Sequence, residues 1–149
     1  MSNRRLAPYE TTLHVRDTCL CLHLQRAARV VARTFDDAFR PLGITQGQFS
    51  LLMSLNRPEP PAIGSVADLL AMDRTTLTAN LKPLQRRGLV RIKVDESDHR
   101  SRRLALTADG RALLAEATPI WKRHHAALER QLRRSADALR ADLIALSDA

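Results

Sequence analysis

Hydroxyl and cationic side chains gather in the middle of the chain in a pattern that suits contact with nucleic acid. Short hydroxyl groups can approach base edges closely, and cations neutralise phosphates. The residues with suitable types and spacing are Arg74, Thr75, Thr76, Thr78, Ala79, Lys82 and Arg86. A solvated charged face would also explain the cations. Such a face usually carries Glu–Lys pairs, however, and no acidic residue lies between Asp73 and Asp95.

The positive charge is concentrated in this segment. The 149 residues have 24 Lys or Arg against 16 Asp or Glu, a net charge of +8. Between Lys82 and Arg103 there are eight basic and three acidic residues, a net of +5. Such a patch predicts a polyanionic partner, because binding releases counterions from phosphates. With only five aromatic residues in the chain, stacking on single-stranded bases is disfavoured, so the sequence predicts double-stranded DNA as the partner.

Two short helices are expected to position the threonines. Ser65 is expected to cap a helix that runs through Leu70. Asp73 is expected to cap the next helix by accepting a hydrogen bond from the N–H of Thr75 or Thr76. About two residues would separate these helices, which is the spacing of a helix-turn-helix.

The second of these helices has a clear inward face. Leu77, Leu81 and Leu84 fall together at helical spacing, which turns the threonines and cations outward. Pro83 predicts a kink or a loosened last turn, because it lacks an N–H and disfavours the helical conformation of the residue before it. Gly88 is expected to end the helix in the left-handed conformation.

A basic hairpin is expected next. Residues 89–94 alternate between apolar and charged, as a half-buried strand does, and residues 103–106 can return antiparallel. The polar loop between them is expected to project into solvent, where Arg100 and Arg102 would suit the negative potential of a minor groove. Asp98 is expected to hold the Arg100 guanidinium in a bidentate pair. An ordinary surface salt bridge is the alternative interpretation.

Longer helices flank this region. Apolar residues at helical spacing predict one helix from about residue 17 to residue 39 and another from Thr107 to about residue 134, bent at Pro119. Thr45 and Gln48 have the spacing of a capping box, which begins a helix that runs to about residue 55. Prolines forbid a helix at residues 57–61, and Ser135 is expected to begin the last helix.

The predicted fold class is mainly α with a small antiparallel β wing (α+β), in a single domain of residues 1–149. A winged helix-turn-helix lobe would span about residues 44–110, and N- and C-terminal dimerisation helices about 10–40 and 111–149. The terminal helices carry more apolar surface than one small lobe covers, which predicts a homodimer. Packing of the two chain ends on each other within one chain is the alternative.

The sequence also predicts the cellular compartment and whether the protein is an enzyme. No apolar run reaches the roughly 18 residues that cross a bilayer, the first ten residues lack a signal-peptide core, and two cysteines are too few for a disulfide framework. We therefore expect a soluble cytoplasmic protein without a membrane partner. The chain has no nucleophile elbow, phosphate loop or carboxylate constellation, so neither an enzyme nor a cofactor is expected.

Five segments, which follow one another in order between residues 41 and 110, resemble the MarR family of bacterial transcription regulators. They are residues 41–49, 69–78, 84–90, 95–103 and 106–110. The resemblance implies a homodimeric winged helix-turn-helix repressor or activator whose recognition helices enter successive major grooves of a pseudo-palindromic operator. It also implies that Arg100 enters the minor groove and that Asp98 positions it.

The resemblance further implies an effector site. In this family a small molecule, often an aromatic acid or phenol, binds between the dimerisation helices and the DNA-binding lobe and weakens operator binding. Parts of the first, second and fifth expected helices would line this site here. The candidate residues are His23, Phe49, Met53 and Trp121.

Two cysteines allow other interpretations. Cys21 lies in a segment similar to the one in which the family's organic-hydroperoxide sensors keep their reactive cysteine, so a redox-sensing regulator is an alternative function. Those sensors hold the thiolate with tyrosines, whereas this chain has Gln25 and Phe35 at the matching positions. The alternative is that Cys19 and Cys21 are small apolar fillers in a helical core. Cys19 and His23 could share one helix face, but structural zinc needs four ligands, so no metal site is expected.

A protein-binding winged-helix module is the remaining alternative. Such a module would not need the threonine-rich helix or the basic hairpin. The expected function is therefore duplex-DNA binding.

Overall fold

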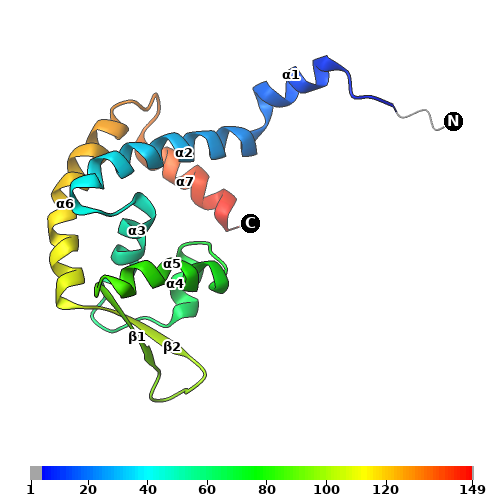
Figure 1. Cartoon of the computed structure of the whole chain (residues 1–149). Helices are drawn as coiled ribbons and strands as arrows, with labels where there is room; N and C mark the ends of the chain where they lie inside the picture. The colour runs from blue at the N-terminus through cyan, green and yellow to red at the C-terminus, as the bar shows by residue number, and fades with distance from the viewer. Residues whose placement is uncertain (1–4, 149) are drawn as a thin grey trace. The chain divides into compact units, whose positions relative to one another are not determined.

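The computed structural model describes residues 5–148. Its elements in chain order are α1 (Tyr9–Thr18), α2 (Leu20–Phe39), the 3-10 helix η1 (Arg40–Leu42), α3 (Gln46–Leu55), α4 (Ile63–Leu69), α5 (Arg74–Arg86), β1 (Val90–Val94), β2 (Arg102–Leu106), α6 (Ala108–Glu129) and α7 (Ala136–Ser147). The fold is mostly helical with a small two-stranded antiparallel sheet (Figure 1), which confirms the predicted fold class. The chain divides into two compact units, residues 5–34 and 35–148.

The first unit contains α1 and most of α2. The single helix expected from about residue 17 is interrupted at Cys19, whose φ of −68° and ψ of 109° are extended. The N–H of Cys19 still donates to the carbonyl of Val15, and its own carbonyl accepts from His23, so the interruption leaves both groups paired. The sequence did not predict α1, but the end of α2 at Phe39 is confirmed.

In the second unit, α3 supplies much of the core. The capping box is confirmed: the N–H of Gln48 donates to the Thr45 hydroxyl at 3.2 Å, and the N–H of Thr45 donates to the Gln48 amide oxygen at 3.0 Å. α3 then runs to Leu55, as predicted, and buries Phe49, Leu51, Leu52 and Leu55.

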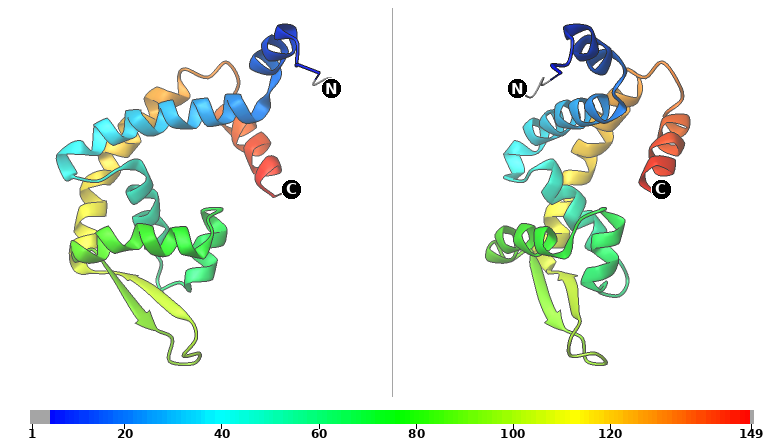
Figure 2. Two further views of the ribbon diagram at one scale, coloured as in Figure 1. Left: turned by 45° about the vertical axis from the view of Figure 1, so that its right-hand side comes forward. Right: turned by 90° about the vertical axis from the view of Figure 1, so that its right-hand side faces the viewer.

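The two strands form the wing, defined here as β1, β2 and the loop of residues 95–101 between them. Val90 pairs with Leu106 and Ile92 with Leu104, and Leu104 and Leu106 are buried as predicted. Ala62 forms an isolated antiparallel bridge with Arg103 on the other side of β2. The views in Figures 1 and 2 show the hairpin extending away from the helices of its unit.

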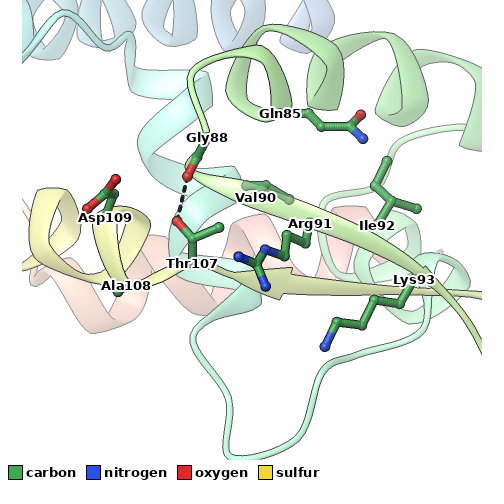
Figure 3. A pocket seen from close by; sticks show the side chains of 9 residues that line it. All are labelled: Gln85, Gly88, Val90, Arg91, Ile92, Lys93, Thr107, Ala108 and Asp109. Atoms are coloured by element: carbon green, nitrogen blue, oxygen red, sulfur yellow. Dashed lines mark hydrogen bonds between the residues drawn. The ribbon is translucent and has the colours of Figure 1, made fainter.

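The base of the wing is joined closely to α6. The Thr107 hydroxyl accepts from the N–H of Gly110 at 3.0 Å, which caps α6 as predicted, and it donates to the carbonyl of Gly88 at 2.6 Å (Figure 3). A Cβ on Gly110 would lie 2.1 Å from the Leu89 carbonyl oxygen. Only glycine therefore allows α6 to approach the wing this closely.

The C-terminal helices differ from the prediction at one boundary. α6 continues through Pro119 but ends at Glu129, not near residue 134, because the N–H groups of Gln131 and Leu132 bond in a tighter turn. Ser135 caps α7 by accepting from the N–H of Ala138, which confirms that prediction. None of the helices between residues 5 and 148 is both long and apolar enough to cross a bilayer.

Candidate nucleic-acid interface and ligand pocket

The helix-turn-helix begins earlier than predicted. α4 starts at Ile63 after Ala62, so Ser65 lies inside the helix and its hydroxyl donates to the carbonyl of Ala62 at 3.1 Å. The predicted Ser65 cap was therefore wrong, because Ala62, fixed by its bridge to β2, is where the chain enters the helix. Residues 70–73 separate α4 from α5, which is four residues and not two.

The turn between α4 and α5 is compact and strained. The N–H groups of Leu70, Ala71 and Met72 donate back to carbonyls of α4, at 3.0 Å, 3.1 Å and 2.9 Å. Ala71 has a φ of +51° and is the one non-glycine residue within 5–148 with a positive φ. For a residue with a Cβ the left-handed conformation costs roughly 1 kcal/mol or more. Neighbouring contacts must therefore hold Ala71 in place.

Asp73 fixes the start of α5. Its carboxylate accepts from the N–H of Thr76 at 2.7 Å and from the Thr76 hydroxyl at 2.9 Å. These two hydrogen bonds to Thr76 lower the pKa of Asp73 below its ordinary value. The predicted cap is confirmed, and the Thr76 hydroxyl is already engaged as a donor.

The two faces of α5 agree with the helical wheel. Leu77, Leu81 and Leu84 are fully buried. The exposed residues on the helix include all the predicted contacts, which are Arg74, Thr75, Thr76, Thr78, Ala79, Lys82 and Arg86. α5 runs unbroken through Pro83 to Arg86, and the Pro83 carbonyl accepts from the N–H of Arg87. Gly88 has a φ of +70°, as predicted.

Arg87 has a different role from its basic neighbours. Its guanidinium donates to the carbonyls of Gly43 and Leu42, at 2.7 Å and 3.3 Å. These bonds tie the end of α5 to the connection before α3. Arg87 therefore contributes charge to the surface from a fixed position.

The wing is organised by Asp95, which the sequence did not identify. Its carboxylate accepts from the N–H of Ser97 at 2.9 Å, from the Ser97 hydroxyl at 2.8 Å and from the Arg103 guanidinium at 2.7 Å. Arg103 also donates to the carbonyl of Pro60 at 3.2 Å. The hydrogen bonds from Ser97, together with those from Arg103, lower the pKa of Asp95 to about 2.

Asp95 is only 9% exposed, so the expectation that the whole polar loop projects into solvent was wrong at this residue. Its charge is compatible with burial because Ser97 and Arg103 supply the missing hydrogen bonds. The Asp-x-Ser spacing is typical of an Asx turn and could have identified the local half of this arrangement. Arg103 and Pro60 lie too far along the chain for any local pattern to pair them.

The predicted bidentate pair of Asp98 with Arg100 was also wrong. The Asp98 carboxylate accepts from the backbone N–H of Arg100 at 3.0 Å, and no ion pair joins the two side chains within the described residues. A turn two residues long brings the backbone N–H to the carboxylate and leaves the guanidinium free. The Arg102 guanidinium donates to the carbonyls of His99 and Ser101, both at 3.2 Å.

A hollow of about 490 Å³ lies at the base of the wing beside α5 (Figure 3). Its lining includes Gln85 of α5, Thr107 and Asp109 at the start of α6, and two cations of β1. Those cations, Arg91 and Lys93, point to one side of β1, and Ile92 points to the other (Figure 3). Arg91 and Lys93 therefore place positive charge on the face of β1 opposite to Ile92.

A second pocket lies among α3, α4 and α6 and has a volume of about 540 Å³. It is lined by Phe49, Ser50, Met53, Ser54, Leu69, Leu70, Thr118, Trp121 and Lys122. Three of the four predicted ligand residues, Phe49, Met53 and Trp121, thus meet at one pocket. His23 belongs to the other unit.

The pocket has an aromatic wall and one charged group. Phe49 stacks on Phe39 with ring centroids 4.7 Å apart, and Trp121 stacks on His125 at 4.5 Å. Lys122 is the charged residue of the lining, and the sequence could have suggested it as the neighbour of Trp121. No sequence signal pointed to Leu69 or Leu70, because they reach the pocket from the helix-turn-helix.

The cysteines differ from each other. Cys21 is exposed, and its sulfur accepts from the side-chain amide of Gln25 at 3.4 Å. Cys19 is half-buried. Within residues 5–148, no three His, Cys, Asp or Glu side chains are grouped so that they could hold a metal ion.

Comparison with known proteins gives consistent matches. Residues 42–101 match a family model described as MarR family. The chain is 32% identical over 101 residues to the organic hydroperoxide resistance transcriptional regulator of Bacillus subtilis, covering 68% of this chain and 69% of that protein.

Two solved structures are similar over most of their length. The M. tuberculosis regulator MosR in complex with DNA has a TM-score of 0.81 and 35% identity, covering 88% of this chain and 95% of that one. BpsR of Bordetella bronchiseptica, whose DNA binding is regulated by 6-hydroxynicotinic acid, has a TM-score of 0.77 and 26% identity, covering 87% and 94%.

Proposed function

The chain belongs to the MarR family of DNA-binding transcription regulators, and from this premise we propose that it is a homodimeric repressor that a small ligand releases from its operator. One observation carries most of the proposal. α5 presents an outward face of hydroxyls and cations without a single acidic residue, beside a basic wing that Asp95 and Arg103 hold in place.

We assign the DNA contacts as follows. Thr75, Thr78 and Ala79 read base edges in the major groove, because their short side chains let α5 approach closely. Thr76 offers its methyl group there, since its hydroxyl proton is engaged by Asp73. Phosphate contacts come from three exposed cations of α5, which are Arg74, Lys82 and Arg86.

The wing contributes the minor-groove contact. No hydrogen bond of the Arg100 guanidinium occurs within the described residues, so this group is free to enter the groove. Asp98 shapes the loop through the backbone of Arg100, and Arg102 adds charge from a position fixed by loop carbonyls. Arg91 and Lys93 extend the positive surface to phosphates beside the wing.

The dimer interface is assigned to the helices outside the lobe of residues 44–110, namely those within 10–40 and 111–149. The exposed apolar side chains there include Leu20, Leu22, Leu24 and Val30 of α2 and Leu139, Leu143, Ile144 and Leu146 of α7. A soluble monomer rarely exposes so many. Two-fold symmetry would place two copies of α5 about one helical turn of DNA apart, roughly 34 Å, which matches a pseudo-palindrome.

The effector is proposed to be a small aromatic acid or phenol that binds in the 540 Å³ pocket. Phe49 and Trp121 supply an aromatic wall, Ser50 and Thr118 supply hydroxyls, and Lys122 offers a counter-charge for a carboxylate or phenolate. The similarity to BpsR, which responds to 6-hydroxynicotinic acid, supports this chemistry.

Selection of bound duplexes from genomic DNA tests the central proposal. We expect a pseudo-palindromic site whose affinity falls by about 10³-fold or more between 50 and 200 mM salt. Arg100→Ala should weaken binding to this site. Binding that is absent, or that does not depend on salt, would contradict the assignment of α5 and the wing to DNA.

Redox sensing is the second candidate, favoured by the exposed Cys21 sulfur and the similarity to a hydroperoxide-resistance regulator. The Cys21 thiolate would take one oxygen from an organic hydroperoxide and become a sulfenic acid, and the hydroperoxide would leave as the alcohol. Loss of peroxide-induced DNA release in Cys21→Ser, with Cys19→Ser unchanged, is the expected result. A full response in Cys21→Ser would exclude this mechanism.

A further inference from the structure

We infer that the turn between α4 and α5 couples the pocket to the recognition helix α5, and that the switch in this turn is the backbone of Ala71. The inference rests on the proposed function, because it concerns how an occupant of the pocket weakens operator binding. Leu69 and Leu70 line the pocket, and Arg74, the first residue of α5, follows after only three more residues.

The segment between the pocket and α5 is held by hydrogen bonds at each residue. Leu70, Ala71 and Met72 each donate their N–H to a carbonyl of α4. The next residue, Asp73, is bonded to Thr76 of α5 through both a backbone N–H and a hydroxyl. A displacement of Leu70 therefore reaches the cap of α5 through two residues.

Ala71 is the residue of this turn with an unfavourable backbone conformation. Its φ of +51° is unfavourable for a residue with a Cβ, so the observed turn persists only while its neighbours hold it. If Leu70 moves, Ala71 can return to a negative φ, and the start of α5 must shift with it. In this inference the backbone of Ala71 is the element with two arrangements, and an occupant of the pocket biases it.

The pocket walls differ in how readily they can move. Phe49 is buried and stacks on Phe39, and Trp121 stacks on His125, so each aromatic ring of the lining is packed against another ring. Leu69, which lines the same pocket from α4, is 63% exposed and so is less constrained by packing. An occupant pressed against the aromatic wall would therefore move the side of the pocket that leads to Ala71.

The test replaces the ligand by a side chain, so it needs no identified effector. Met53→Trp places an indole in the pocket, and Ala71→Gly removes the Cβ that disfavours the present turn. Met53→Trp should lower affinity for the selected duplex by about tenfold, a typical coupling between two sites. In the Ala71→Gly background the loss of affinity should shrink to less than about threefold.

Asn56→Trp is the matched control. Asn56 lies at the end of α3, the helix of Met53, and outside the lining of the pocket, so this substitution should change the affinity for the duplex little.

A second readout uses the free protein. Hydrogen exchange of the Thr76 amide, which is bonded to Asp73, should be faster in Met53→Trp than in the wild type, and Ala71→Gly should restore its protection. Thr118→Phe fills the pocket from α6 and repeats the experiment if Met53→Trp does not fold. Unchanged exchange on filling the pocket, or equal losses of affinity with and without Ala71→Gly, would overturn the inference.

A separate measurement tests the effector proposal itself. Titration of the wild-type protein with 6-hydroxynicotinate, followed by the fluorescence of Trp121, reports occupancy of the pocket by an aromatic acid. Absence of binding there would count against the proposed effector class. The exchange and affinity results of the filled variants would still decide whether the turn couples the pocket to α5.

Discussion

Two aspartates begin the two segments to which we assign the DNA contacts, Asp73 before α5 and Asp95 before the wing loop. Each accepts an N–H and a hydroxyl from a residue two or three positions ahead. They differ in what else holds them: the bonds of Asp73 stay within one helical turn, whereas Asp95 is also bonded by Arg103, which reaches the carbonyl of Pro60. The start of α5 is therefore stabilised by residues within the same helical turn, whereas the wing is stabilised by residues far away in the sequence.

The most severe test of this difference is at the base of the wing. Gly110→Ala would place a Cβ 2.1 Å from the Leu89 carbonyl oxygen, so α6 and the wing must separate. We expect the free energy of unfolding to fall by about 3 kcal/mol, the upper range for overpacking. Denaturant unfolding measures it.

Gly47→Ala is the matched control, because a Cβ there would meet only the Thr45 hydroxyl at 3.9 Å. It lies in the first turn of α3, and alanine is favoured over glycine in a helix by up to about 1 kcal/mol. We therefore expect Gly47→Ala to be neutral or stabilising. Equal effects of the two substitutions would contradict the close approach at the base of the wing.

The hydrogen bonds of Asp95 with Ser97 and Arg103 should contribute to DNA binding. Asp95→Ala removes the acceptor of Ser97 and Arg103, so the loop no longer positions Arg100. We expect operator affinity to fall by about tenfold, as for loss of a groove-reading arginine. Fluorescence anisotropy with the selected duplex measures this affinity.

Two comparisons sharpen that prediction. Glu96→Ala removes the same charge from the neighbouring exposed position and should have little effect. The double variant Asp95→Ala with Arg100→Ala should bind no more weakly than either single variant, because both substitutions remove the same contact, that of Arg100 with DNA. Additive losses would show that Asp95 acts on something other than Arg100.

On α5, free and engaged cations should behave differently. Lys82 is exposed on the outward face, whereas the Arg87 guanidinium is bonded to the carbonyls of Gly43 and Leu42. Lys82→Ala should reduce the slope of log affinity against log salt by about 1. Arg87→Ala should mainly lower stability. A larger change of slope for Arg87→Ala would reverse these assignments.

The sequence predicted what local periodicity and spacing determine. The Thr45, Asp73, Thr107 and Ser135 caps and the buried leucines of α5 are confirmed, because each depends on residues within one or two turns. The same holds for Gly88 at the end of α5.

What the sequence did not predict depends on partners far along the chain. α4 starts at Ile63 because Ala62 is bridged to β2, and Asp95 can be buried because Arg103 links it to Pro60. The Asp98 prediction was wrong for a local reason, since a backbone N–H lay closer to the carboxylate than the guanidinium did. Leu69 and Leu70 join the pocket only through tertiary packing, which no spacing encodes.

The smallest expected effect is the loss of stability at acid pH, when the two aspartates become protonated. The folded-state pKa of Asp95 lies at about 2, below its ordinary 3.8, mainly because Ser97 donates two hydrogen bonds to the carboxylate. A lowered pKa in the folded state means that the ionised carboxylate stabilises the fold above the ordinary pKa. That stabilisation is lost as pH falls from about 4 towards 2.

The free energy of unfolding of the wild type should therefore fall more steeply between pH 4 and pH 2 than that of Asp95→Ala. The pKa of Asp73 is also lowered, by its hydrogen bonds with Thr76. The free energy of unfolding of Asp73→Ala should therefore also fall less steeply between pH 4 and pH 2 than that of the wild type. Amide exchange can separate the two regions, because protonation of Asp95 should expose the Ser97 amide while Thr76 follows Asp73. If both amides lost protection together, α5 and the wing would order as one cooperative unit, and the distinction between local and distant support would not hold.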